Sequence, residues 1–513
     1  MREYDSRLAR GAARVRPPTS SGRARCIAIG LPIAALSGLL MIPEAAPPPP
    51  PPPPPSVSAA ARPFQWNQDE VWLALEKRFR EAAALGCERL RGPINTGLRR
   101  GDRFLVELAA RSVGPEEPIL DSIEHNTFEL AALVAGCFER LPEYARLVAR
   151  TRSVVKRQSE SWDMNAGKDR LYRLLFGGRA ALEEVMLQGP PEAMPALVHG
   201  DDEASATPST RILGVTVHSG DLLVSRGGAA SSALIAVGND YQGNFSHVAL
   251  VHVDEKTNIP TVIQSNEHGG LHPTAIEEYL KNVKLRIMIL RPRANLAAVV
   301  ADPMLPHRAA TIALLRAQRR DTPYDFAVDH RDDSRMYCSE VPAWAYRQVG
   351  VTLWMDISRI SAPGTRQWLA DLGVKHFDAQ EPSDLEYDPQ LRVVAEWRDP
   401  QTLYIDHVDN VVTEAMLGGA ARGDRLTHVW YVLPFVRLLK GYSVLLGFVG
   451  KMGPVPEGLS ATVAARFHTL ARRHAAIKQR VLVLAEEFQS GKGYRPPEWQ
   501  LLQMAKEALE ELR

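Results

Sequence analysis

The segment YCSEVPAWAYRQVG, residues 337–350, carries the clearest chemical signal in this sequence. Residues 339–348 are predicted to form a helix that ends at Gly350. Because proline fits only the first turn of a helix, Pro342 puts the helix start close to Cys338. A thiol there lies near the positive end of the helix dipole, which is expected to lower its pKa. The free N–H groups could also hold an oxyanion, so Cys338 is the candidate nucleophile.

A cysteine nucleophile needs a base, and the candidate is His247 in NFSHVALV, residues 244–251. This histidine stands at the entrance of an apolar strand, where a fixed backbone can project its imidazole. A histidine in a strand is more often a packed or surface residue, and that alternative stays open. Short β-type runs alternate here with short helical pieces, which predicts an α+β domain over residues 211–375. The runs are 222–224, 248–251, 262–263 and 285–290.

Five short motifs occur in one order along residues 214–350, and together they resemble a known family. They are Gly220-Asp221-Leu222-Leu223, residues 245–251, residues 261–264, Tyr324-Asp325-Phe326 and Tyr337-Cys338-Ser339-Glu340. This order resembles the circularly permuted papain-like hydrolases of the YiiX/YaeF type, in the NlpC/P60 superfamily. The resemblance implies a small antiparallel sheet whose strand histidine faces a cysteine at a helix N-terminus. The histidine should precede the cysteine, as it does here. The expected fold class is therefore α+β, with this domain flanked by N- and C-terminal helical regions.

The resemblance also implies a third polar group, often a glutamate, on the strand after the histidine. Gln264 stands at that position. Its amide can accept a hydrogen bond from the imidazole and set the tautomer, but it cannot stabilise an imidazolium by charge. Glu267 is the alternative orienting residue if the strand ends early. Tyr337 either supports the oxyanion site or is a packed aromatic. Asp221 is expected to support a turn, and Glu340 to cap the helix or support the nucleophile.

These roles predict a cysteine amidase or peptidase that works through a thioester acyl-enzyme, with cell-envelope peptides as the expected substrates. The imidazole takes the thiol proton, the sulfur attacks an acyl carbon, and water releases the acyl group. One alternative is a thiol-dependent lipid acyltransferase or lipase at a membrane, because permuted relatives catalyse both kinds of reaction. Another is a membrane-tethered binding protein whose papain-like domain has lost its activity. The expected partner is thus a peptide or lipid acyl substrate.

The N-terminus carries signals for export or anchoring. The basic tail, residues 1–25, contains seven arginines and only two acidic residues. Residues 26–42 follow as an uncharged apolar run, which is typical of a signal peptide or a retained membrane anchor. The Pro-rich linker, residues 43–65, contains nine consecutive prolines that would form a stiff spacer. We expect a protein of the cell envelope, exported or membrane-anchored, that associates with the membrane through its N-terminal segment.

Helical patterns flank the middle domain. Apolar residues recur at three- to four-residue spacing over 66–200, which predicts a helical domain. Cys87 and Cys137 lie there in apolar surroundings and are interpreted as small buried hydrophobes. Residues 380–513 are predicted to form a C-terminal helical region. Its most apolar piece, residues 429–452, is interrupted by charges, proline and glycines, so we expect buried packing, with an interfacial helix as the alternative.

Composition excludes several classes of protein. The 61 basic and 60 acidic residues give a net charge of +1, which argues against a nucleic-acid partner bound by phosphate neutralisation. Four scattered cysteines are too few for a disulfide scaffold or a zinc knuckle. His268 and His272 could be imagined in a metal cluster, but they lack clear third and fourth ligands. We therefore predict no cofactor and no metal.

Overall fold

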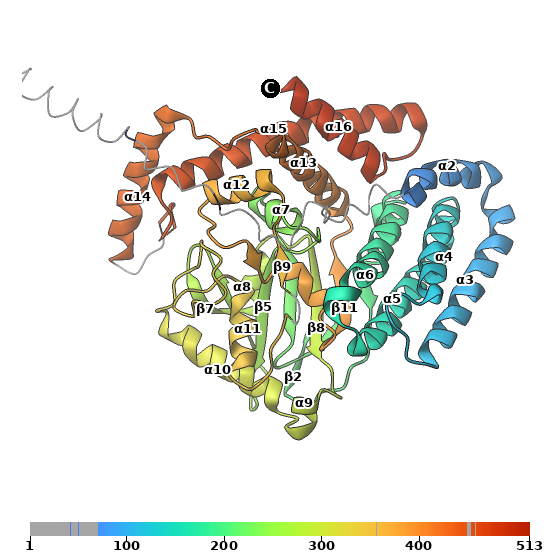
Figure 1. The fold of residues 1–513 in the computed structure, drawn as a ribbon, viewed down its shortest axis with the longest axis horizontal. Helices are drawn as coiled ribbons and strands as arrows, with labels where there is room; N and C mark the ends of the chain where they lie inside the picture. The colour runs from blue at the N-terminus through green and yellow to red at the C-terminus, as the bar shows by residue number, and fades with distance from the viewer. Residues whose placement is uncertain (1–41, 43–49, 51–69, 355–356, 449–452, 457) are drawn as a thin grey trace, which may run out of the picture.

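The computed structural model describes residues 42, 50, 70–354, 357–448, 453–456 and 458–513. The predicted basic tail, almost all of the apolar run and almost all of the Pro-rich linker lie outside these residues. The described part has a sheet at its centre, a group of helices beside one edge of the sheet, and further helices across the top (Figure 1). Helices and an antiparallel sheet together confirm the α+β class.

The central sheet has seven strands in the order β1-β11-β8-β4-β5-β6-β7, and every neighbouring pair is antiparallel. The strands are β1 (Leu197–His199), β4 (Leu222–Arg226), β5 (His247–Val253), β6 (Pro260–Asn266), β7 (Gly270–Ala275), β8 (Arg286–Pro292) and β11 (Leu391–Arg398). Two smaller pairs are β2 (Ser209–Ile212) with β3 (Val215–His218), and β9 (Ser358–Arg359) with β10 (Asp378–Ala379).

Both faces of the sheet are covered, and the side chains of β5 alternate between them. Val248 and Leu250 pack in one cluster with α10 (Leu305–Arg319) and α11 (Glu340–Arg347). Ala249 and Val251 pack on the other side, with α8 (Ile276–Lys281) and the β2–β3 pair. By this alternation, the first residue of the strand, His247, belongs to the α8 side.

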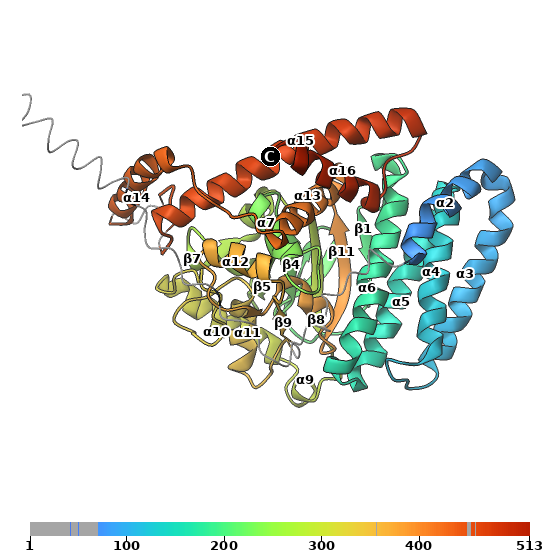
Figure 2. The ribbon, with the colours of Figure 1, turned by 45° about the horizontal axis from the view of Figure 1, so that its top comes forward.

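Two helical groups flank the sheet (Figures 1 and 2). The N-terminal group packs beside β1 and β11 through α5, and it comprises α2 (Glu70–Leu85), α3 (Cys87–Ala109), α4 (Pro118–Ala135), α5 (Leu141–Gln158) and α6 (Met164–Leu187). The C-terminal group comprises α12 (Pro363–Asp371), α13 (Leu403–Ala421), α14 (Leu433–Gly447), α15 (Ala461–Lys492) and α16 (Glu498–Glu511). Short helices lie between strands: α7 (Ala230–Val237), α9 (Ala297–Ala301) and the 3₁₀ segment η5 (Pro382–Glu386). A further 3₁₀ segment, η6 (Trp430–Val432), directly precedes α14.

The sheet extends beyond the expected range of 211–375. Strand β11 lies inside the region predicted to be helical over 380–513, and β1 lies inside the helical range 66–200. The prediction is wrong at these two strands for a physical reason. In β11, Arg392, Glu396 and Arg398 are buried in ion pairs, so the strand shows no continuous apolar run.

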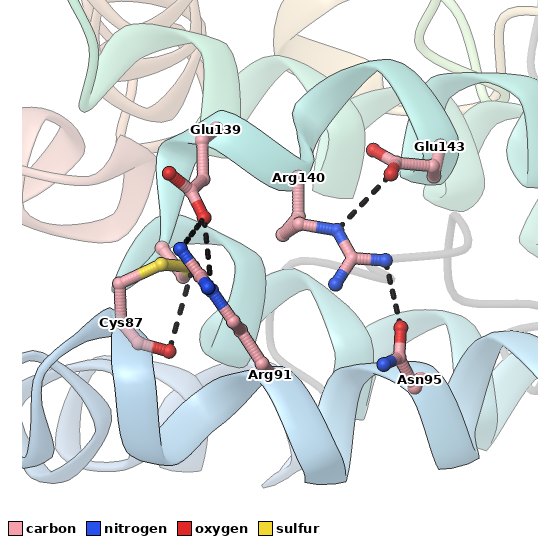
Figure 3. Close-up of a disulfide and its surroundings, with 7 residues drawn as sticks. Cys87, Arg91, Asn95, Glu139, Arg140 and Glu143 are labelled. Carbon is pink, nitrogen blue, oxygen red and sulfur yellow. Dashed lines mark hydrogen bonds and ion pairs between the residues drawn. A yellow bond between two sulfur atoms is a disulfide. The ribbon is translucent and has the colours of Figure 1, made fainter.

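The interpretation of Cys87 and Cys137 as small buried hydrophobes is also wrong, because the two form a disulfide (Figure 3). The bond joins the first residue of α3 to the loop after α4, across a sequence separation of 50 residues. Beside it, Arg91 pairs with Glu139 at 3.0 Å. The packing of α3 against α4 brings the two sulfurs together, and the spacing along the chain gives no sign of it.

The apolar segment 429–452 is not buried as expected. Within its described part, 429–448, only Leu433 and Val436 are buried, and both pack toward α15. Large hydrophobic side chains on the rest of α14 face outward. Among the helices of the described residues, none is long and apolar enough to cross a membrane.

Candidate active site

Cys338 lies two residues before the start of α11, as the helix prediction placed it. Ser339 is the N-cap residue, and Pro342 lies in the first turn. The preceding chain is tied to the sheet, because the Ser265 hydroxyl donates to the Met336 carbonyl at 2.6 Å. The Tyr337 N–H donates to the Glu340 carboxylate at 2.6 Å, so Glu340 caps this helix start. The nucleophile candidate is thus fixed by β6 on one side and by its own helix on the other.

His247 and Gln264 meet on neighbouring strands. His247 Nε2 lies 2.8 Å from Gln264 Oε1. The amide of Gln264 donates through Nε2 to Thr274 Oγ1 at 3.1 Å, so its oxygen is left to accept from the imidazole. This assigns the imidazole proton to Nε2 and leaves Nδ1, the ring nitrogen nearer the main chain, as the basic atom. Glu267 instead lies exposed in the turn after β6, which continues to Asn266.

The sulfur of Cys338 lies beside the main chain of His247. Cys338 Sγ is 3.9 Å from the Ser246 carbonyl oxygen, and the Val248 N–H also interacts with the sulfur. Among the described residues, the thiol donates to Ser246 and forms no hydrogen bond with the imidazole. Nucleophile–base hydrogen bonds are often loose before substrate binds. The structure therefore brings both residues to one strand start without joining their side chains.

The thiol of Cys338 is neutral in this environment. Burial raises its pKa to about 12, and the nearby carboxylates of Glu381 and Glu340 act in the same direction. The N–H groups of Val248 and Ser339 lower the pKa but do not compensate. The expectation that the helix N-terminus would lower this pKa is wrong. The sulfur is only 2% exposed, and desolvation of a thiolate outweighs the dipole of an eight-residue helix.

The imidazole of His247 is also neutral. Burial lowers its pKa to about 4, and the positive charge of Lys284 adds to this effect. Lys284 Nζ lies 4.4 Å from the centroid of the Tyr279 ring, which in turn lies 6.4 Å from the His247 ring. Gln264 acts in the opposite direction through its hydrogen bond but carries no charge. At neutral pH the site therefore holds a thiol and a neutral imidazole rather than an ion pair.

Of the residues near the sulfur, Tyr337 was expected from the sequence, whereas Glu381 and Tyr279 were not. Glu381 is buried just before η5, where burial raises its pKa to about 8. Tyr279 donates its hydroxyl to Ser225 Oγ at 2.9 Å. Tyr337 is buried, and its ring lies 5.6 Å from that of Tyr324. Glu381 follows Cys338 by a long stretch of chain, so only folding brings the two close together.

Asp221 supports a turn, as expected. One of its carboxylate oxygens accepts from the His218 N–H at 2.8 Å, and Arg291 pairs with the same carboxylate at 2.8 Å. This aspartate lies at the start of β4, away from the sulfur, and it holds the loop that enters the sheet. It therefore has a structural role.

Access to the sulfur is restricted. Cys338 itself is only 2% exposed. Tyr337, the residue before Cys338, and Phe245, two residues before His247, are also buried. An acyl group can therefore reach Cys338 only if the side chains around the sulfur move.

One other group has the residue types of a metal site. Ligand atoms of Glu184, His407 and Glu498 lie within 4.8 Å of one another. His407 Nε2 already lies 2.9 Å from Glu183. Burial disfavours the imidazolium, but Glu183 outweighs it and raises the pKa of His407 to about 9. His407 is thus ion-paired with Glu183, which lies beside these three residues.

The histidine and the amide on adjacent antiparallel strands, with a later cysteine at a helix start, agree with the arrangement that the resemblance implies. Residues 216–395 match the model of the family described as permuted papain-like amidase enzyme, YaeF/YiiX, C92 family. This match confirms the resemblance and supports a hydrolase. It spans most of the sheet and includes His247, Gln264 and Cys338. No curated protein and no solved structure matches the chain.

Proposed function

We propose that the segment 216–395 is a cysteine hydrolase of the amidase or peptidase type, with Cys338 as nucleophile, His247 as base and Gln264 as orienting residue. The observation that carries this proposal is the 2.8 Å bond between His247 and Gln264, which leaves Nδ1 as a free base beside the strand start where the sulfur lies. The family match over the same segment supports it. A neutral pair of a buried thiol and a half-buried imidazole suits acyl transfer by general-base catalysis.

The reaction proceeds by attack of sulfur on an acyl carbon. His247 Nδ1 takes the thiol proton during the attack, because a free thiolate is unfavourable in this environment. The backbone N–H groups at the start of α11 are the proposed donors to the oxyanion, with the Tyr337 side chain beside them. The imidazolium then protonates the leaving amine or alcohol, and a thioester forms. Water attacks the thioester with His247 again as base, which releases the acid and restores the thiol.

The proposed location is the cell envelope, outside the reducing cytosol. The disulfide between Cys87 and Cys137 supports this, because disulfides persist in oxidising compartments. The basic tail and the apolar run that precede the described residues are the proposed export or anchoring signal. Peptides of the cell envelope would then be available as substrates.

A second candidate is a lipid acyltransferase or lipase, and the exposed apolar surface of α14 favours it. The same acyl-enzyme chemistry would then act on a lipid ester, with a second lipid or water as the acceptor. The chemistry at Cys338 and His247 is common to both candidates.

The test is acylation of Cys338 by an activated peptidyl ester, followed by intact mass and peptide mapping in a Cys26→Ser background. We expect one acyl group on Cys338 at neutral pH, and its loss in Cys338→Ser and His247→Ala. Glu267→Gln, in the exposed turn, is the matched control and should acylate like the parent. Equal acylation rates in His247→Ala and the parent would contradict the proposal and favour a binding protein. Turnover of peptide amides against phospholipids then separates the two enzyme candidates.

A further inference from the structure

The outer surface of α14 and η6 carries a concentration of exposed large hydrophobic side chains. We call it the α14 apolar surface. Each of its members is more than half exposed; they are Trp430, Tyr431, Phe435, Leu438, Tyr442, Val444, Leu445 and Phe448. Contiguous apolar surface of this kind on a folded protein marks an interaction site.

The helix is attached to the rest of the protein along one narrow stripe. Leu433 and Val436 are its buried residues, and they pack with Val455 and residues of α15. Tyr431, Phe435, Leu438, Tyr442 and Leu445 recur at alternating spacings of four and three, so they form one outward stripe. Val444 and Phe448 lie outside that stripe and are exposed as well. The C-terminal half of the helix is therefore apolar on more than one side.

The composition of this surface suits a bilayer interface. Tryptophan and tyrosine, which prefer the headgroup region, stand at 430, 431 and 442. Residues 429–448 contain two cationic residues, Arg437 and Lys440, and no acidic residue. Cations beside a broad apolar face are typical of helices that lie in the plane of an anionic membrane. A coiled coil with a second copy would cover only the single stripe.

The position of α14 agrees with the predicted membrane segment. The Arg437 guanidinium donates to the carbonyl oxygen of Ile42, the last residue of the apolar run 26–42. Figures 1 and 2 place α14 at the opposite end of the protein from α2–α6. Ile42, the residue at which the proposed N-terminal anchor ends, thus lies beside α14.

We propose that α14 and η6 form a membrane-docking element whose apolar surface inserts into the interface of an anionic phospholipid bilayer. The inference does not rest on catalysis, because none of its residues belongs to the proposed active site. It assigns a bilayer, rather than a second copy or the chain's own apolar run, as the partner of this surface. Docking would hold the enzyme at a fixed orientation on the membrane.

The test uses the full chain with an environment-sensitive fluorophore on α14. Leu445→Cys is labelled with nitrobenzoxadiazole in a Cys26→Ser, Cys338→Ser background and mixed with vesicles of phosphatidylglycerol and phosphatidylcholine. We expect a severalfold rise in emission with a blue shift, weaker with phosphatidylcholine alone and weaker at high salt. The same label at Val106→Cys, an exposed apolar site on α3, is the matched control and should not respond.

Two further variants separate α14 from the N-terminal run. Phe435→Glu with Leu438→Glu should reduce vesicle flotation of the full chain at least tenfold, whereas Val106→Glu should not, with thermal unfolding unchanged in both because all three side chains are exposed. An unresponsive label at 445, with flotation retained in the double variant, would overturn the proposal. Blue-shifted emission from the label before lipid is added would also overturn it, because the chain's own apolar run would then cover this surface. A lipid-free oligomer abolished by the double variant would assign the surface to a second copy.

Discussion

An amide beside the proposed catalytic histidine limits the charge that the histidine can carry. Gln264 accepts a hydrogen bond from the Nε2–H group and fixes the tautomer, but it contributes no charge to hold an imidazolium. Lys284 disfavours the imidazolium further. The pair that results is neutral at rest, so proton transfer has to accompany attack on the substrate. This property follows from two side chains near the imidazole.

The first prediction concerns the pH dependence of acylation. His247 has to be unprotonated to act as a base, so with a pKa of about 4 the rate should rise through about pH 4 and be level near neutrality. Gln264→Glu adds a carboxylate, raises the pKa of His247, and should move this rise upward by about one pH unit or more. The measurement is the pH–rate profile, together with titration of the imidazole by nuclear magnetic resonance.

Two controls accompany it. Gln264→Leu removes a hydrogen bond worth about 1 kcal/mol, so the rate should fall roughly five- to tenfold without an upward shift of the profile. Glu267→Gln should leave both rate and profile unchanged, since its side chain lies in the exposed turn. A profile that does not move in Gln264→Glu would show that Gln264 does not orient His247.

At the scale of elements, the disulfide holds one end of the N-terminal helical group together. It closes the chain from the start of α3 to the end of α4, across 50 residues that include both helices. A cross-link of this length acts mainly by restricting the unfolded chain. It belongs to the flanking helices and lies outside the segment that matches the amidase family.

The prediction at this scale is a loss of stability without the cross-link. Cys87→Ser with Cys137→Ser should lower the free energy of unfolding of the helical group by about 4 kcal/mol, from the loop-closure relation for a loop of this length. Urea unfolding with and without reductant measures it. The parent should lose a similar amount on reduction, whereas the double variant should not respond. If reduction leaves the parent unchanged, the bond contributes nothing to stability.

At the scale of the whole molecule, buried ion pairs join the three parts of the chain. Glu183 of α6 pairs with Arg286 of β8 at 2.7 Å and with Arg398 of β11 at 3.2 Å. Arg286 also pairs with Asp406 of α13 at 2.7 Å. One network therefore connects the N-terminal helices, the sheet and the C-terminal helices. Because every member is nearly fully buried, loss of one charge leaves its partners without compensation.

The prediction for the whole molecule is that Glu183→Ala destabilises the fold by about 3–5 kcal/mol. The substitution removes the carboxylate that pairs with Arg286, Arg398 and His407. Chemical unfolding, followed by a signal from the sheet, should show this decrease in the free energy of unfolding. Glu510→Ala, which breaks the exposed pair with Arg422, is the matched control and should cost less than about 1 kcal/mol. An equal effect of the two substitutions would argue against the network as the link between the parts.

The same network predicts a pH dependence. The pKa of His407 is raised from 6.5 to about 9, so its stabilising contribution is complete below about pH 6.5 and is lost as pH rises through about 9. Unfolding free energies measured from pH 6 to pH 9.5 should therefore fall in the parent. In Glu183→Ala this fall should be smaller, because the main partner of the imidazolium is gone.

Local signals account for what could be predicted about the candidate site. Pro342 and Gly350 bound α11, and the apolar run after His247 marks β5, since both depend on residues adjacent in the chain. The choice between Gln264 and Glu267 depends on where β6 ends, and residue patterns predict the end of a strand less accurately than its presence. The charge states could not be predicted. They depend on burial and on Glu381 and Lys284, which only folding brings to the site.

The sequence by itself determined the α+β class, the papain-like order of motifs, and the three residues of the proposed site. The class and the helix start at Cys338 follow from local periodicity and helix boundaries, whereas the order of motifs and the role of Gln264 are what the family resemblance implies. Only the tertiary structure decided that Cys87 bonds to Cys137, that β1 and β11 complete the sheet, that the thiol is neutral and that α14 is exposed. Each of these depends on which surfaces come into contact when distant segments pack, and local sequence patterns do not predict those contacts.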